Sequence, residues 1–316
     1  MLRFPARKLG TLSAAPAWLE DFGLLREPSA HGSYAARLET FGAWLRSNGA
    51  RFDALELRDG EAAGGSRGQG CAGFATADVP AHAPVVELPL RILVTSEAVR
   101  FSEIGRVGAA SGVDDNGGNL YLTLALLQMW TEQQQHHHHH HHYHHKGGAG
   151  EPFHAPYLDI LPRRLPSWPL FWDDVDLNRL MGSPLVASVE ARREAIARDF
   201  DALREAAEAS RRAVPAAERS LCALDSATAA DFAVAELLVC SRAFLVPGAG
   251  AGGRADRCLV PLADMLNTAL PHNCDVDFGM RDGEVASERV FAMTAVHPIR
   301  RGQQVHDSYG YKSNDR

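Results

Sequence analysis

The sequence predicts an α+β protein, because helical and strand patterns both occur and neither type fills the chain. The helical segments are long and rich in helix-forming residues, whereas the strand-like segments are short and apolar. At 316 residues the chain is long enough for one large domain or two ordinary ones, each with a core of its own.

Composition excludes several classes of protein. A hydrophobic share of 46% and a charged share of 22% are typical of a soluble globular chain, and no apolar run is long enough for a transmembrane helix. The net charge of −7 argues against a nucleic-acid partner held by bulk electrostatics. Five cysteines without a Cys-x-x-Cys pair exclude a zinc ribbon and indicate a reduced, intracellular protein. Cytoplasm, nucleus and plastid are not distinguished.

The N-terminal third begins without strong periodicity. Residues 1–37 are predicted to be a loose leader, either a ragged terminus or a short organellar peptide, since residues 1–17 are basic and carry no acid. Apolar residues from Leu38 to Leu45 then recur at helical spacing, and Asn48 with Gly49 ends that helix. Residues 59–70 contain five glycines and form a turn-rich entry to the next segment.

Two short strands and a buried helix are predicted next. Residues 85–89 and 92–95 have strand patterns, separated at Pro89. Residues 120–130 are apolar nearly all round and predict a buried helix. This helix runs into a low-complexity segment at 131–150, rich in histidine, where clustered imidazoles could bind zinc or nickel. Nothing nearby fixes ligand geometry, so the prediction is a disordered insertion and no metal site.

The second half is predicted to begin with an irregular segment and two helices. Residues 152–172 hold five prolines and predict an extended loop on the core. Ser183 before Pro184 is a helix start, and that helix continues to about residue 213. Thr228 and Asp231 form a capping box that opens a helix ending near residue 244. Strand-like pieces follow at 258–261, 285–287 and 289–293.

Four patches of the sequence suggest chemistry. Glycines at residues 68–73 let the backbone approach a ligand closely. Ser241-Arg242, at a helix C-terminus, suits either a carboxylate or compensation of the helix dipole. Asp264 and Asn267 lie in an apolar run, where they either tie down the backbone or face a ligand. Tyr309 precedes a glycine and could present its hydroxyl to a cleft.

In this order and spacing, the patches resemble the SET-domain methyltransferases. The similarity is to the plant Rubisco large-subunit methyltransferase group, whose relatives include protein-lysine methyltransferases and the actin-histidine methyltransferase. It covers roughly residues 38–316. The matching segments are Gly70 with Phe74-Ala75-Thr76, Pro156-Tyr157-Leu158 with Leu161-Pro162, Ser241-Arg242-Ala243-Phe244, Asp264-Met265-Leu266-Asn267, and Ser308-Tyr309-Gly310 with Lys312-Ser313-Asn314.

The resemblance implies a fold, a cofactor and site residues. It implies an α+β SET domain over 38–316, with short β-sheets, a pseudoknot through residues 264–268 and a helical insertion at about 176–243. It implies S-adenosylmethionine as cofactor, Tyr309 as the catalytic residue and no metal. The cofactor residues that it implies are Gln69, Gly70, Cys71, Ser241, Arg242, Asp264, Asn267, Thr268 and Tyr309.

Three departures from the family pattern bear on activity. Thr268 stands where a histidine is usual, Ala72 stands where a second glycine is usual, and the sequence stops at Arg316, before the usual helical C-terminal domain that helps to hold substrate. The predicted activity is S-adenosylmethionine-dependent methylation of a lysine in another protein, without nucleic acid or membrane and with an undetermined oligomeric state. A non-catalytic SET-fold binding protein and a histidine methyltransferase are the alternatives, with metal binding by the histidine tract as a third.

Overall fold

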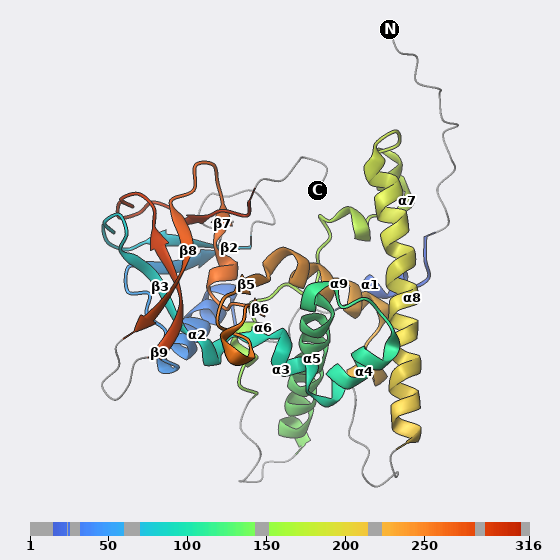
Figure 1. Cartoon of the computed structure of the whole chain (residues 1–316). Helices are drawn as coiled ribbons and strands as arrows, with labels where there is room; N and C mark the ends of the chain where they lie inside the picture. The colour runs from blue at the N-terminus through green and yellow to red at the C-terminus, as the bar shows by residue number, and fades with distance from the viewer. Residues whose placement is uncertain are drawn as a thin grey trace.

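Strands and helices gather in two different parts of the structure, a computed structural model that describes residues 15–23, 25, 32–59, 70–142, 152–213, 223–281 and 288–310. Figure 1 shows β2, β3, β8 and β9 together on the left and α4, α5, α8 and α9 on the right. One continuous cluster of buried apolar side chains, from Trp18 to Val305, joins the two parts. The two parts therefore share one main hydrophobic core, and a smaller separate cluster contains Leu177, Val186 and Val189.

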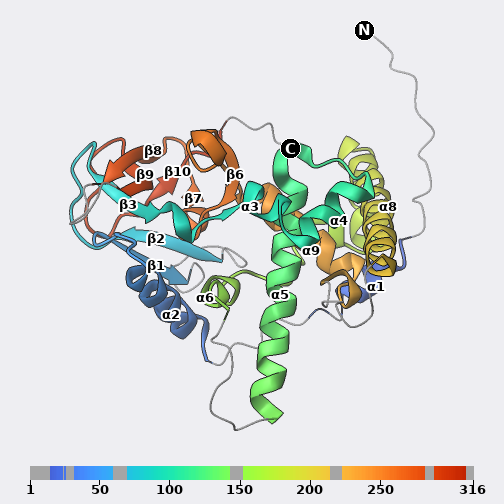
Figure 2. The same ribbon diagram turned by 60° about the horizontal axis from the view of Figure 1, so that its bottom comes forward.

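The helical part is built around two long helices. The α-helices are α1 (Trp18–Phe22), α2 (Tyr34–Ser47), α3 (Ser96–Arg100), α4 (Glu103–Ser111), α5 (Asn119–His142), α6 (Ala155–Leu158), α7 (Asp174–Asn178), α8 (Pro184–Arg212) and α9 (Ala229–Arg242). In the turned view of Figure 2, α6 lies between α2 and α5. Helix α6 therefore contacts α5 of the helical part on one side and α2, which packs on β1, on the other.

The strands form small sheets. They are β1 (Leu55–Asp59), β2 (Cys71–Ala75), β3 (Pro84–Pro89), β4 (Val94–Thr95), β5 (Phe244–Val246), β6 (Asp256–Leu259), β7 (Asn267–Thr268), β8 (Cys274–Arg281), β9 (Glu288–Ala295) and β10 (His306–Asp307). The sheet orders are β1-β2, β3-β9-β8, β4-β6-β5 and β10-β7. The first three sheets are antiparallel, and β10 pairs with β7 in parallel.

Segments far apart in the sequence cross at β2. The Val305 N–H donates a 2.8 Å hydrogen bond to the Gly73 carbonyl, and the chain then enters β10 beside β7. A Cβ on Gly73 would overlap Cδ2 of Leu266 and lie 3.0 Å from Cδ1 of Leu55. Glycine at this position therefore lets the chain before β7 pass directly against β2.

Helix boundaries set by local signals are confirmed. Ser183 caps α8 by accepting a hydrogen bond from the Leu185 N–H, with Pro184 in the first turn. Both hydrogen bonds of the Thr228–Asp231 capping box are present at the start of α9. Residues 152–172 are mostly irregular, as predicted, apart from α6 and one 3-10 turn at Pro169–Phe171.

Two segments are more ordered than their composition predicts. Within the expected leader, α1 buries Trp18 and Phe22, and the Phe22 ring stacks on Phe171 at 4.0 Å between centroids. Helix α5 passes the predicted end at residue 130 and continues to His142, so the start of the histidine tract is helical rather than a disordered insertion. Gln133 stabilises this extension, because its side-chain amide donates a 2.7 Å hydrogen bond to the Asp159 carboxylate.

The strand predictions are correct only in part. The segment at 92–95 is a strand only at Val94–Thr95, because Leu90–Ile92 forms a 3-10 turn. The segments 85–89 and 289–293 lie within β3 and β9, whereas only the first half of 258–261 belongs to a strand, because β6 ends at Leu259. The segment 285–287 lies outside the described residues.

Candidate functional site

Predicted site residues from distant parts of the chain line one cleft of about 610 Å³, named here the first cleft. It is lined by Gly70 and Cys71 before and in β2, by Ser241 and Arg242 at the end of α9, and by Met265. Residues between 160 and 168 form another wall. The first two patches identified in the sequence therefore meet at one place.

The β2 side of the first cleft presents backbone. Gly70 has a φ of +21° and open space where a Cβ would lie, so its main chain is accessible to a ligand. Cys71 pairs with Asp59 at the end of the β1-β2 ladder. Burial raises the pKa of the Cys71 thiol to about 12, which keeps it protonated and unreactive at neutral pH.

The α9 side of the first cleft presents a guanidinium group. Nη1 of Arg242 donates a 2.7 Å hydrogen bond to the Asp264 carbonyl and lies 3.8 Å from its carboxylate oxygen Oδ2. Arg242 is therefore held by tertiary contacts as well as by its favourable place at a helix C-terminus. Its other nitrogens donate no hydrogen bond within the described part of the chain and are available to a ligand.

Asp264 is the buried centre of the site. Its side chain has no exposed surface. Oδ2 accepts a 2.6 Å hydrogen bond from the Tyr157 hydroxyl, whereas Oδ1 has no hydrogen-bond partner among the described residues. Burial raises the Asp264 pKa to about 6, against the opposing effect of the Arg242 charge. Asp264 thus connects the segment that contains α6 to the end of α9.

Tyr309 lines a second cleft of about 250 Å³, which Arg242 also lines. Ser241 and Arg242 line both clefts, and Asp264, Asp307 and Tyr309 are among the other residues that line the second. The Tyr309 hydroxyl donates a 2.7 Å hydrogen bond to the Leu266 carbonyl. Burial raises the Tyr309 pKa, so this hydroxyl is protonated at neutral pH.

Asn267 and Thr268 lie beside the second cleft. They form β7 and pair with His306 and Asp307 of β10. The Thr268 hydroxyl accepts a 3.3 Å hydrogen bond from the Tyr309 N–H. Thr268, which departs from the family pattern, therefore still positions the chain at Tyr309. The structure places neither Asn267 nor Thr268 among the residues that line the two clefts.

Sequence reasoning assigned no role to several residues in and near the two clefts. Tyr34 and Arg37 line it from α2, although they were placed in the expected leader. Tyr157 belongs to a segment that matches the family, but its hydrogen bond to Asp264 spans 107 residues and has no local signal. Gln69 lies outside the described residues, as do Lys312, Ser313 and Asn314.

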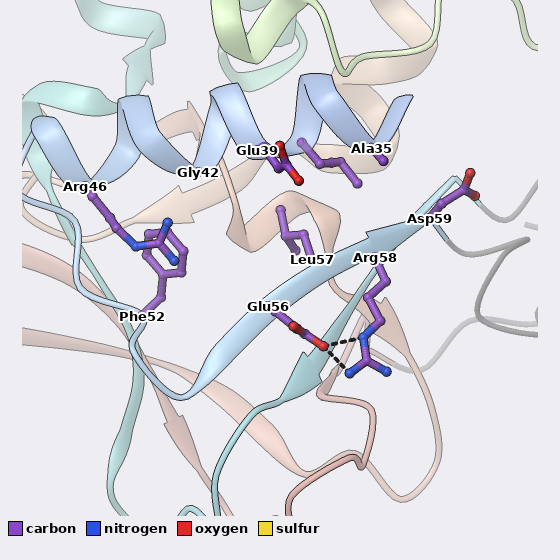
Figure 3. A pocket seen from close by; sticks show the side chains of 10 residues that line it. Ala35, Glu39, Gly42, Arg46, Phe52, Glu56, Leu57, Arg58 and Asp59 are labelled. Carbon is purple, nitrogen blue, oxygen red and sulfur yellow. Dashed lines mark hydrogen bonds and ion pairs between the residues drawn. The ribbon is translucent and has the colours of Figure 1, made fainter. Parts of the chain in front are cut away.

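A third hollow, of about 540 Å³, lies between α2 and β1 (Figure 3). Arg46 covers the Phe52 ring there, at 4.4 Å from its centroid, and Glu56 pairs with Arg58. Asp59 lines both this hollow and the first cleft. None of the predicted site residues lines the third hollow, so it does not form part of the candidate site.

The described residues contain neither a metal-binding cluster nor a membrane-spanning helix. They hold no group of three or more His, Cys, Asp and Glu side chains that could bind a metal ion. No helix among them is both long and apolar enough to span a membrane. The side chains of the histidine tract beyond His136 are outside these descriptions.

Comparisons with known proteins identify the fold. No protein-family model and no curated protein matches the sequence. Among solved structures, the SET domain of LSMT bound to lysine and AdoHcy matches with a TM-score of 0.66 and 20% identity, over 90% of this chain and 56% of that chain. Rubisco LSMT bound to AdoMet matches with a TM-score of 0.61 and 20% identity, over 88% and 54%. The chain thus has the SET-domain fold and spans about half the length of these structures.

Proposed function

We propose that this protein transfers a methyl group from S-adenosylmethionine to a lysine side chain of another protein. The observation that carries the proposal is the position of Arg242 and Ser241 between two clefts, one lined by Gly70 and Cys71 and the other by Tyr309. Two adjacent clefts suit a reaction in which a cofactor and a protein side chain meet from different directions. The ligands named for the structural neighbours, AdoMet, AdoHcy and lysine, support the same assignment.

The first cleft fits the proposed cofactor. Its volume of about 610 Å³ falls within the range of about 300–1,000 Å³ that is usual for small-molecule sites. The guanidinium groups of Arg37 and Arg242 are suited to a carboxylate, and the open backbone at Gly70 leaves room for close approach. S-adenosylmethionine carries such a carboxylate and supplies a methyl group bound to a positively charged sulfur.

The second cleft fits the methyl acceptor. A lysine amine has a solution pKa of about 10.4 and must lose a proton before its nitrogen can attack. The new N–C bond then forms in line with the breaking S–C bond, so alignment of the amine supplies much of the rate. The Tyr309 hydroxyl and the Leu266 carbonyl lie 2.7 Å apart, and both can orient the amine through hydrogen bonds. The released proton goes to solvent.

The test is methylation of peptides that carry a single lysine or a single histidine, with S-adenosylmethionine as the donor. We expect a mass gain of one methyl group on lysine and a loss of at least about 100-fold in rate for Tyr309→Phe. Methylation of the histidine peptide alone would show that the target residue is histidine and not lysine. Cofactor binding without transfer to any peptide or protein extract would favour the non-catalytic SET-fold binding protein.

A further inference from the structure

Asp307 is a buried carboxylate in the wall of the second cleft. Its residue surface is 2% exposed, and it lies with Tyr309 among the residues that line the cleft. One carboxylate oxygen, Oδ1, accepts a 2.7 Å hydrogen bond from the Ser308 N–H. Oδ2 has no hydrogen-bond partner among the described residues. It is also absent from the unpaired polar atoms that are completely buried. This oxygen is therefore available to a group that enters the cleft.

Neighbouring groups do not neutralise Asp307. Besides burial, the charged groups that shift the Asp307 pKa are Asp275, which raises it, and His272, which lowers it. In addition to burial, the charge of Asp307 in turn raises the pKa values of the Cys274 thiol and the Tyr309 hydroxyl. Asp275 has the same sign, and His272 already lies 3.9 Å from the carboxylate of Asp275. Burial raises the Asp307 pKa to about 6. At neutral pH the carboxylate is therefore ionised at an energetic cost, which a cation in the cleft would offset.

Asp307 and Tyr309 lie close to each other in the wall of the second cleft. Asp307 is the last residue of β10, and both residues line the cleft. Asp264 is a second buried acid beside the cleft, but its side chain has no exposed surface and its Oδ2 already accepts the Tyr157 hydrogen bond. Asp307 is therefore the carboxylate of this cleft that can pair with an ammonium group, and an anionic side chain would be repelled by it.

We propose that Asp307 is the specificity-determining residue of the second cleft, which selects a target side chain with a protonated amine by pairing with it on entry. This inference rests on the proposed function, because it assigns the second cleft to the methyl acceptor. It predicts that target recognition depends on charge at the tip of the side chain and not only on an apolar channel.

The test uses two defined probes of nearly equal shape. Nα-acetyl-lysine amide carries the amine, and Nα-acetyl-norleucine amide lacks it. Binding of each is measured by NMR titration, with and without AdoHcy. We expect the parent protein to bind the lysine probe at least about tenfold more tightly, and Asp307→Asn to lose that preference.

Two further variants keep the result interpretable. Asp275→Asn removes an exposed carboxylate close to Asp307 and should keep the preference for the lysine probe. If Asp307→Asn does not fold, Asp307→Val removes the same charge with a side chain that suits a buried strand. AdoHcy affinity and melting temperature, measured for every variant, report on the first cleft and on folding.

The outcomes separate the two proposals. An unchanged preference in the folded Asp307 variants, or no preference in the parent protein, would overturn the role of Asp307. Failure of the parent protein to bind AdoHcy would overturn the proposed function instead, and the titration without AdoHcy would still test Asp307. Equal loss of both probes in Asp307→Asn would indicate a purely structural residue.

Discussion

The Tyr157 hydroxyl donates a 2.6 Å hydrogen bond to Oδ2 of Asp264, 107 residues further along the chain. Both side chains are buried, and Asp264 in turn contacts Arg242, which lines both clefts. This contact makes the position of Arg242 depend on Tyr157 of α6, which is not among the residues that line the two clefts. The arrangement of the site is therefore sensitive to residues outside the two clefts.

Tyr157→Phe removes this hydrogen bond and leaves Asp264 buried without a side-chain donor. We expect the free energy of unfolding to fall by about 1–3 kcal/mol, the usual cost of an unsatisfied buried group. Urea unfolding measures the change. Tyr121→Phe is the matched control, since Tyr121 is also buried and its hydroxyl makes no hydrogen bond within the described residues. Equal stability of Tyr157→Phe and the parent protein would contradict this role.

Gly73→Ala tests the crossing of the chain segments at β2. The new methyl group would overlap the Leu266 side chain, and overpacking of this kind costs about 1–3 kcal/mol. Thermal unfolding should show the loss. Gly42→Ala in α2 is the control, because its methyl group would meet only the Nη1 atom of Arg46 at 3.4 Å. There we expect a gain of up to about 1 kcal/mol from helix propensity. If Gly73→Ala left the melting temperature unchanged, the segment before β7 would not pack against β2 as described.

The two buried acids predict how stability depends on pH. In the folded protein the pKa values of Asp264 and Asp307 are raised from 3.8 to about 6. Between these values the folded state binds more protons than the unfolded state, so this contribution to stability is present below pH 3.8 and is lost as the pH rises through 6. The loss amounts to about 2–3 kcal/mol for the fully buried Asp264.

Urea unfolding at several pH values checks this sign. As the pH rises from about 4 to 6, the parent protein should lose free energy of unfolding relative to Asp264→Asn, which has no carboxyl group to ionise at this position. Asp307→Asn should behave in the same direction. Asp275→Asn, which removes an exposed carboxylate, is the control. A difference that stays constant over this range would rule out the raised pKa values.

Local signals explain which parts of the structure the sequence could predict. The cap at Ser183 and the capping box at Thr228 depend on residues within one helical turn, and both are present. By contrast, β2 was not predicted, because Gly70 and Gly73 give its sequence the composition of a turn. The required glycine at position 73 reflects contact with Leu266, which is distant in sequence.

In the candidate site, too, some residues could be predicted from the sequence and others could not. The family resemblance identified Ser241, Arg242 and Tyr309, and the structure brings these three residues to one pair of clefts. The roles of Tyr157 and Asp307 could not be predicted from spacing. The first depends on a contact between distant segments, and the role proposed for Asp307 depends on its place in the wall of the second cleft. Both became visible only through packing and burial.

Calorimetric titration with S-adenosylmethionine is the most direct test of the central claim, that the first cleft binds this cofactor beside Arg242. We expect one molecule to bind per chain, Arg242→Ala to weaken binding at least about tenfold, and Tyr309→Phe to retain it. Arg198→Ala, which removes an exposed arginine of α8, should bind like the parent protein. Absence of binding by the parent protein, or full affinity in Arg242→Ala, would contradict the account.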